Sequence, residues 1–171
     1  MRKGGVLLPV SSIPSKYGIG TFSKQAYEFV DFLERAGQSF WQILPLGPTG
    51  YGDSPYQSFS TFAGNPYYID LEELIKKGWL TKEECDACDF GSDDGYVDYE
   101  KIYLSRFRIL KIAYERSNIK EDKEFGKFKE DNAAWLEDYA LYMAVKNSFH
   151  GISWIELEVD IRLRIPEAMK C

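Results

Sequence analysis

The sequence lacks several features that would define whole classes of protein. It contains no apolar run that approaches the ~20 residues needed to span a membrane as a helix. The 171 residues carry a formal net charge of -6 and no Lys/Arg cluster, so we expect neither nucleic acid nor a membrane surface as a partner. The basic start at Met1 precedes an apolar run that is too short for a signal peptide. We therefore predict a cytoplasmic protein.

Cysteine and histidine are also scarce. The three cysteines are an odd number, which favours a reduced compartment over a disulfide framework. Cys85 and Cys88 have CxxC spacing, but a structural zinc site needs four ligands, and His150 and Cys171 are distant in sequence. The spacing favours a short helix that carries two thiols. We predict no metal and no cofactor, and the single histidine gives no pattern for a Ser-His-Asp site.

Aromatic residues, by contrast, are abundant at 16%, and tyrosine is the commonest of them. A tyrosine ring offers an apolar face and a hydroxyl, which suits sugar ligands. An aromatic core with its hydroxyl groups at the boundary explains the same composition. Composition alone leaves both interpretations open.

The most informative stretch is the loop at residues 47–60, GPTGYGDSPYQSFS, which directly follows the apolar run 40–46. Its three glycines and two prolines are incompatible with a helix or a central strand. The loop combines hydroxyl groups, a carboxylate, an amide and tyrosine rings on a short piece of backbone. An apolar strand followed by such a loop is typical of a binding site at the carboxyl end of a parallel strand.

The first fifty residues have the pattern of a βαβ unit. Residues 6–10 and 40–46 are short apolar runs that predict buried parallel strands. Between them, Thr21 is expected to cap an amphipathic helix that Gly37 ends as a left-handed residue. No glycine-rich phosphate turn follows the first strand, which argues against a dinucleotide-dependent oxidoreductase.

The remainder is predicted to be mainly helical. Asp70 should cap a helix over 71–77 that Gly78 ends, and Thr81 opens a capping box with Glu84. Longer helices are expected at 99–116 and 133–149, joined by a charged segment at 118–131 that is either a solvated connection or a weak helix. The residues expected to face inward from these two helices are Ile102, Tyr103, Phe107, Leu110, Ala113, Tyr114, Trp135, Leu136, Tyr139, Ala140, Met143 and Ala144.

One parallel strand pair is too little sheet for a domain, so either the two apolar runs are not strands or the chain is incomplete, and we favour the second interpretation. Several segments support this, because they resemble the amino-terminal part of the amylomaltases, the 4-α-glucanotransferases of the α-amylase clan. The resembling segments are GVLLPVSSIP (5–14), YGIG (17–20), WQILPLGPTG (41–50), GYGDSPYQ (50–57), AGNPY (63–67) and WLEDYALY (135–142).

The resemblance implies an α/β fold, the (β/α)8 TIM barrel with inserted helical subdomains. Residues 1–50 then form the first βαβ unit, residues 51–150 the substrate-cleft loop and the inserted helical subdomain, and residues 151–171 the start of the return to the barrel. A full barrel needs about 250 residues, so the chain is expected to be a fragment that resembles the first third of an amylomaltase.

The activity that the resemblance implies is transfer of α-1,4-glucan segments between maltooligosaccharides or starch-derived glucans by a retaining double displacement. Retention needs two carboxyl groups roughly 5 Å apart. The family's catalytic carboxylates follow later barrel strands, and no segment here resembles those motifs. We therefore assign no catalytic residue and predict that the chain alone is inactive. The alternative is a free-standing, non-catalytic glucan-binding module.

By resemblance, Ser54, Tyr56 and Gln57 lie at the substrate cleft, with Tyr56 packing against a glucose ring; the alternative for Tyr56 is packing beneath the loop. Asp53 either binds sugar hydroxyls or caps the local turn. Tyr51 and Tyr103 form an outer platform for a long glucan or, alternatively, pack between helix and loop. Asn65 is expected to hold the loop in shape. The candidate substrate-binding positions are Tyr51, Asp53, Ser54, Tyr56, Gln57 and Tyr103.

Overall fold

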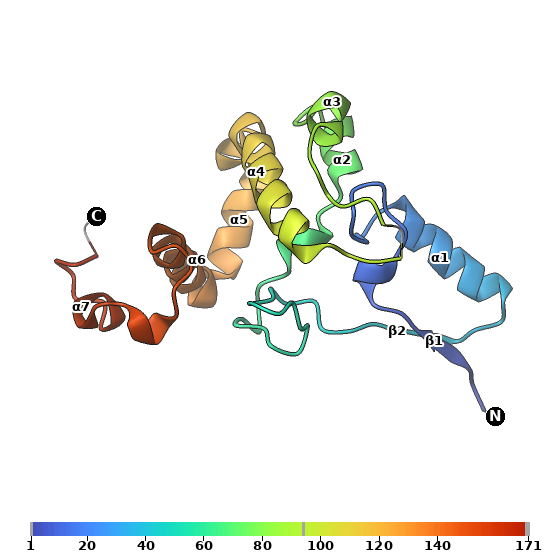
Figure 1. Ribbon diagram of the computed structural model, residues 1–171, viewed down its shortest axis with the longest axis horizontal. Coiled ribbons are helices and arrows are strands. Elements are labelled where there is room, and N and C mark those ends of the chain that lie inside the picture. Colours follow the sequence, from blue (N-terminus) through green and yellow to red (C-terminus); the bar gives the residue numbers. More distant parts are fainter. Residues whose placement is uncertain (1, 94, 170–171) are drawn as a thin grey trace. The chain divides into compact units, whose positions relative to one another are not determined.

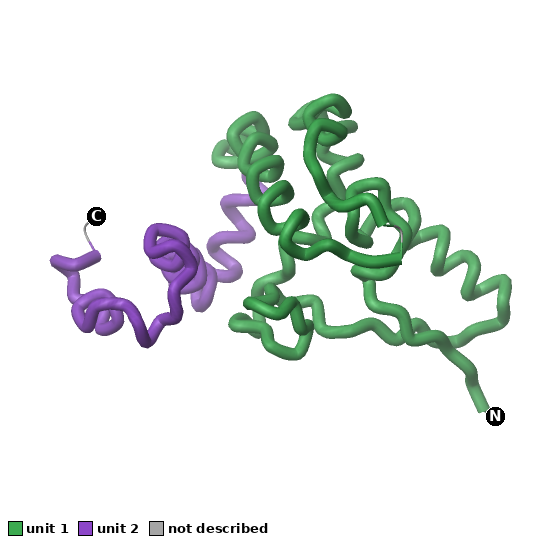
Figure 2. Tube along the Cα trace, viewed as in Figure 1, with its two compact units in different colours: residues 1–122 green, residues 123–171 purple. Residues whose placement is uncertain are grey.

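The computed structural model describes residues 2–93 and 95–169. The chain divides into two compact units, residues 1–122 (unit 1) and residues 123–171 (unit 2), which are coloured separately in Figure 2. None of the described helices has the length and apolar character required to cross a membrane.

Unit 1 begins with the predicted strand, helix and strand. Strands β1 (Gly5–Leu7) and β2 (Phe40–Gln42) pair in parallel, with Gly5 opposite Phe40 and Leu7 opposite Gln42, and helix α1 (Lys24–Arg35) connects them (Figure 1). The predicted parallel pairing is confirmed. Both strands are shorter than the apolar runs, and Val10 lies in the 3-10 helix η1 (Val10–Ser12) instead. Gly37 ends α1 with a φ of 68°, as predicted.

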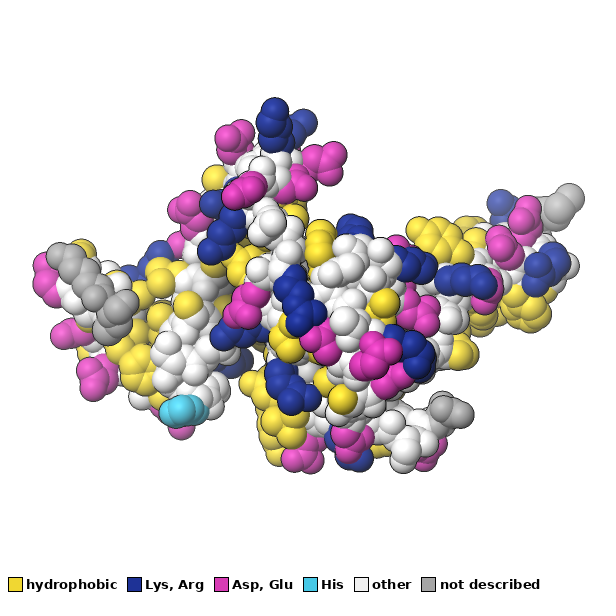
Figure 3. All heavy atoms as spheres, turned by 90° about the horizontal axis from the view of Figure 1, so that it is seen from above, with side chains coloured by type: hydrophobic (Ala, Val, Ile, Leu, Met, Phe, Trp, Pro, Cys, Tyr) yellow, Lys and Arg dark blue, Asp and Glu magenta, His cyan; other side chains and the backbone are white. Residues whose placement is uncertain are grey.

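Two expectations for this part of the chain were wrong. Thr21 does not cap α1: Ser23 is the N-cap residue, and its hydroxyl donates to the Thr21 carbonyl at 3.4 Å. The strands are not buried, since Leu7 is 56% and Phe40 59% exposed. The sheet of the described residues has two strands, so both of its edges are open. Figure 3 shows hydrophobic side chains at the surface beside charged ones in the right-hand part, where α1 lies.

Three helices follow, and local sequence signals define their ends. Helix α2 (Leu71–Lys76) begins at Asp70, whose Oδ1 accepts from the Glu72 N–H at 3.0 Å. Helix α3 (Lys82–Asp86) begins with the predicted capping box: Thr81 Oγ1 accepts from Glu84 N–H, and the Glu84 carboxylate accepts from Thr81 N–H. Helix α4 spans Tyr99–Arg116, as predicted.

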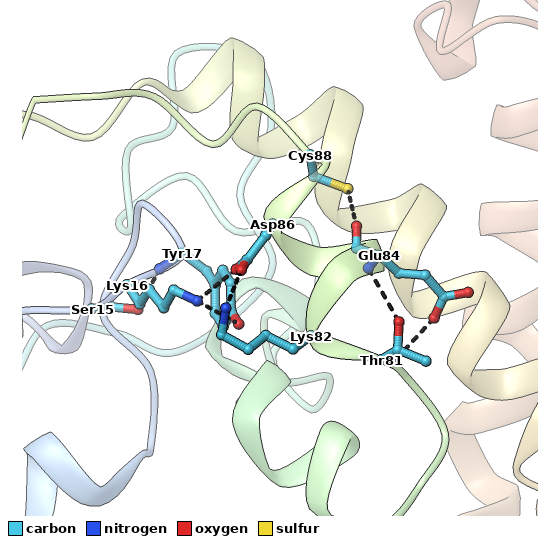
Figure 4. A network of polar contacts seen from close by, with 8 residues as sticks. All are labelled: Ser15, Lys16, Tyr17, Thr81, Lys82, Glu84, Asp86 and Cys88. Atoms are coloured by element: carbon cyan, nitrogen blue, oxygen red, sulfur yellow. Dashed lines mark hydrogen bonds and ion pairs between the residues drawn. The ribbon is translucent and has the colours of Figure 1, made fainter.

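Ion pairs connect α3 to other segments of unit 1 (Figure 4). Asp86 accepts from Lys16 Nζ and Lys82 Nζ, each at 2.5 Å, and so joins α3 to the loop that follows η1. Arg116 of α4 binds both oxygens of Glu84, at 2.6 and 2.8 Å. These hydrogen bonds and the capping bond lower the pKa of Glu84 to about 2.

The core of unit 1 lies between α4, α2, α3 and the loop after η1. Its buried members are Tyr17, Ile19, Tyr67, Leu71, Leu80, Cys85, Phe90, Ile102, Ile109 and Ala113. The prediction for α4 was partly wrong, because Tyr103, Phe107 and Tyr114 are 56%, 40% and 49% exposed. The buried face of the helix includes Arg106 instead.

Arg106 is fully buried, and its Nη2 donates to the Ile69 carbonyl. Its Nε and Nη1 have no hydrogen-bond partner within the described part of the chain. Burial lowers the pKa of the guanidinium to about 10. A charged residue on the buried face explains why hydrophobic periodicity placed that face incorrectly.

Unit 2 contains helices α5 (Lys123–Asp131), α6 (Ala133–Ser148) and α7 (Val159–Arg162) and the 3-10 helix η4 (Trp154–Glu156). The short η3 (Ile119–Glu121) precedes it in unit 1. The segment 118–131 is therefore largely helical. No described residue of α6 is buried, and Ala140 and Ala144, which were predicted to face inward, are exposed.

Candidate functional site

The loop at 47–60 folds back on itself. Thr49 and Ser58 form an isolated antiparallel bridge. Inside it, Asp53 N–H donates to the Gly50 carbonyl and Gln57 N–H to the Ser54 carbonyl, both at 3.1 Å. A side chain at Gly47 would place its Cβ 2.4 Å from Ser58 Oγ, so the Ser58 side chain would have to move to accommodate it.

The backbone of Asp53 is in the left-handed region, with a φ of 53°, after Gly52 at 95°. Few residue types adopt this conformation, and aspartate is one that does so readily. The turn directs the Asp53 side chain toward the interior of unit 1.

The segment after the loop is anchored to the residues that precede the loop. Asn65 N–H donates to the Leu46 carbonyl at 2.8 Å, and Asn65 Oδ1 accepts from Tyr67 N–H at 3.0 Å. The second bond begins the 3-10 helix η2 (Pro66–Tyr68). Asn65 therefore holds this segment in shape, as the sequence indicated, and fixes the positions of Tyr67 and Tyr68.

A cavity of about 190 Å³ lies beneath the loop. Five segments that are separate in sequence line it: η1 with its N-cap residue, the loop after η1, the segment after β2 with the central loop, η2 with its N-cap residue, and the start of α4. The lining residues are Pro9, Ser11, Ile19, Leu44, Thr49, Asp53, Pro55, Asn65, Tyr67, Tyr68 and Tyr99.

The cavity is rich in hydroxyl groups. Burial raises the pKa values of Tyr67, Tyr68 and Tyr99, and hydrogen bonds to Ser11 partly offset this for Tyr68 and Tyr99. Burial also raises the pKa of the Asp53 carboxyl, against the opposing effect of Thr49. The cavity thus offers tyrosine ring faces together with donors and acceptors of hydrogen bonds.

The predicted site residues divide between the two sides of the loop. Asp53 lines the cavity, whereas Tyr51 and Tyr56 project outward, with Tyr56 74% exposed. Gln57 is exposed and Ser54 is half-buried. It is Pro55, and not Tyr56, that packs beneath the loop.

Tyr103 lies on α4, half-exposed, with its ring edge-to-face to Phe107 at 5.4 Å. Phe107 in turn contacts Tyr67, with ring centroids 5.8 Å apart. Tyr103 is thus connected by aromatic contacts to a residue that lines the cavity.

The sequence did not identify Ser11, Tyr67, Tyr68 and Tyr99 as parts of this site. These four residues come from three segments that only the tertiary fold brings together. Two features of the sequence could have indicated two of them. Ser11 follows the first predicted strand, and Tyr67 directly follows Asn65 and Pro66.

The cysteine pair does not belong to this site. Cys85 is buried in the core, and burial raises its pKa to about 11. Cys88 Sγ donates to the Glu84 carbonyl at 3.4 Å and accepts from Arg108 Nη2 at 3.3 Å. The described residues contain no group of three or more His, Cys, Asp and Glu side chains able to hold a metal ion, and Cys171 lies outside them.

Comparison with known proteins gives a consistent result. The family model described as 4-alpha-glucanotransferase matches residues 8–171. The 4-alpha-glucanotransferase of Clostridium butyricum is 52% identical over 94% of this chain and 33% of that protein. The enzyme of the same name from Streptococcus pneumoniae serotype 4 is 50% identical over 99% of this chain and 34% of its own length.

A comparison with solved structures finds a related protein. An amylomaltase from Streptococcus agalactiae, solved in complex with acarbose, superposes with a TM-score of 0.88 at 38% identity, over 99% of this chain and 34% of that one. The chain therefore spans about a third of the length of the relatives that it matches.

Proposed function

The chain belongs to the 4-alpha-glucanotransferase family, and from this premise we propose that it supplies one wall of the glucan cleft of such an enzyme. The enzyme transfers α-1,4-glucan segments between maltooligosaccharides or starch-derived glucans. The family match and the coverage of a third of each relative favour part of an enzyme over a free-standing binding module.

The loop at 47–60 is the observation that carries the proposal. It presents the rings of Tyr51 and Tyr56 outward on a backbone that the Thr49–Ser58 bridge and the Asn65 contacts hold in shape. A rigid support lowers the entropic cost of binding, and a tyrosine ring packs well against the apolar face of a sugar. The related amylomaltase was solved with acarbose bound, which agrees with a carbohydrate ligand.

Each side chain has a proposed role that follows from its position. Tyr56 packs against a glucose ring, and Ser54 and Gln57 hydrogen-bond sugar hydroxyls. Asp53 shapes the loop from its cavity side, where Thr49 opposes the effect of burial on its carboxyl group. Tyr51 and Tyr103 provide an outer platform for a longer glucan.

The catalytic carboxylates are proposed to come from the remainder of the enzyme. A retaining transfer needs a nucleophilic carboxylate, which forms a glycosyl ester, and a carboxylic acid that protonates the leaving oxygen, roughly 5 Å apart. Asp53 is the one carboxylate among the described residues that line the cavity. We therefore assign binding and orientation of substrate, but no bond cleavage, to this chain.

The architecture supports the same proposal. We infer that residues 1–50 form the first βαβ unit of a (β/α)8 barrel, that residues 51–150 form the cleft loop and an inserted helical subdomain, and that residues 151–171 begin the return to the barrel. Further strands pairing with β1 and β2 would cover apolar side chains such as Leu7 and Phe40, which are more than half exposed.

A chimera tests the proposal. The part of the Clostridium butyricum relative that matches this chain is replaced by residues 1–171, and release of glucose from maltotriose is measured. We expect the chimera to be active and the 171-residue chain alone to be inactive. A folded but inactive chimera would contradict the proposal, as would transfer activity in the chain alone.

A further inference from the structure

Unit 2 contains a cavity of its own, of about 180 Å³, which the proposed function does not use. Helix α6, the 3-10 helix η4 and the segment after α7 form its walls. Its lining includes two aromatic residues, an ion pair and apolar side chains: Trp154, Tyr142, Asp138, Arg164, Leu141 and Val145.

The two aromatic rings form an angled wall. The ring centroids of Tyr142 and Trp154 are 6.0 Å apart, and the rings are tilted by 42°. Leu141 and Val145 come from the same helix as Tyr142 and add apolar surface. This part of the cavity suits the flat apolar face of a ring-shaped ligand.

Polar groups complete the lining. Arg164 Nη2 donates to Asp138 Oδ1 at 2.6 Å, and both side chains are at least half exposed. Together they offer hydrogen-bond donors and acceptors with no net charge. A neutral ligand with several hydroxyl groups can use both kinds of group.

The backbone at Arg164 is unusual. Its φ is 55°, in the left-handed region, at the turn that ends α7, where glycine is the common residue. The turn is held by the Arg164 N–H, which donates to the Ile161 carbonyl at 3.0 Å. Non-glycine residues with a left-handed backbone, such as Arg164 in the lining of this cavity, are found more often at binding sites.

From these observations we propose that the cavity in unit 2 binds a single hexose ring, such as the end of a glucan, at a site separate from the loop at 47–60. The ring packs on Trp154 and Tyr142, and its hydroxyl groups bind Asp138 and Arg164. The volume of about 180 Å³ is below the ~300–1,000 Å³ of pockets for drug-sized ligands, so the cavity accommodates a single ring. The identity of the sugar rests on the proposed function.

Titration of the 171-residue chain with glucose, followed by nuclear magnetic resonance of the tryptophan indole N–H groups, tests this proposal. The sequence has four tryptophans, and the Trp154 signal is assigned from its loss in Trp154→Phe. We expect glucose to shift the Trp154 signal in a saturable manner. Cyclohexanol, which shares the ring shape but has one hydroxyl group, should bind at least tenfold more weakly.

Arg164→Gly separates binding from folding, because glycine adopts the left-handed backbone without strain. We expect this variant to keep its melting temperature and to bind glucose about tenfold more weakly, since the hydrogen bonds from the guanidinium are lost. Asp138→Asn, which keeps the size of the side chain, should weaken binding in the same direction.

Tyr56→Ala distinguishes this site from the loop site and should leave the glucose shift of Trp154 unchanged. If the proposed function fails while the Trp154 shift persists, the cavity remains a hexose site. The proposal is overturned if glucose does not shift Trp154, if cyclohexanol binds equally well, or if folded Arg164→Gly binds glucose like the wild type.

Discussion

Two regions of unit 1 differ in how they cover their apolar side chains. In the helical region, α2, α3 and α4 enclose a core in which Leu71, Ile102 and Ile109 are at most 2% exposed. In the strand region, β1, α1 and β2 leave Leu7, Phe40 and other large apolar residues more than half exposed. The same chain thus contains a closed core and an open apolar surface.

The difference shows which of the two regions buries its own apolar side chains. The helical region has its own caps, ion pairs and a core that residues of this chain enclose. The strand region has a two-stranded sheet with open edges, which is marginal by itself. The central loop lies between them and takes its shape from both, through Leu46 on one side and Tyr67 on the other.

The largest expected effect is on the closed core. Ile102→Ala removes a fully buried side chain from α4 and should lower the free energy of unfolding by about 2–5 kcal/mol. Leu104→Ala, two residues along the same helix but 64% exposed, is the matched control and should change it by less than about 0.5 kcal/mol. Chemical denaturation measures both. Equal effects would contradict the contrast between buried and open surfaces.

A smaller effect is expected in the segment between β1 and α1. A Cβ at Gly20 would lie 1.9 Å from the Val10 carbonyl oxygen, so Gly20→Ala must displace backbone and should cost about 1–3 kcal/mol. Gly64→Ala has no heavy atom within 4 Å of its Cβ and serves as the control. If thermal melting shows the same stability for both variants, the close contact between the first loop and η1 does not exist in solution.

The smallest effect concerns the ion pair between α3 and α4. Hydrogen bonds from Arg116, together with the capping bond from Thr81, lower the pKa of Glu84 from its ordinary value of 4.5 to about 2, so the charged form is favoured by folding. This stabilisation is present above about pH 4.5 and is lost as the pH falls toward 2. Melting temperatures of the wild type and Glu84→Gln should therefore converge over this interval. A constant difference between them would exclude this role.

Local signals allowed the helical region to be predicted. The caps at Asp70 and Thr81 and the glycine at 78 act within a few residues, so the sequence contains all of their determinants. The buried face of α4 was misplaced because Arg106, a charged residue, occupies it. Its burial depends on the Ile69 carbonyl, which is distant in sequence.

The candidate site was predictable only on its loop side. The composition of residues 47–60 pointed to a binding loop, and the resemblance selected Tyr56 within it. The cavity behind the loop depends on tertiary contacts of Ser11, Tyr67 and Tyr99, which no local pattern joins. The prediction that the strands are buried was wrong, because an apolar run does not show whether other residues of the chain pack over it.

Tyr56 provides the most direct test of the proposal that the loop binds glucan. In the chimera with the Clostridium butyricum relative, Tyr56→Ala should lower kcat/KM for maltotriose about 10- to 100-fold, because the packing surface for a glucose ring is removed. Tyr27→Ala on α1 is the matched control, since both tyrosines are 74% exposed, and it should keep full activity. Unchanged kcat/KM in a folded Tyr56→Ala chimera would contradict the account.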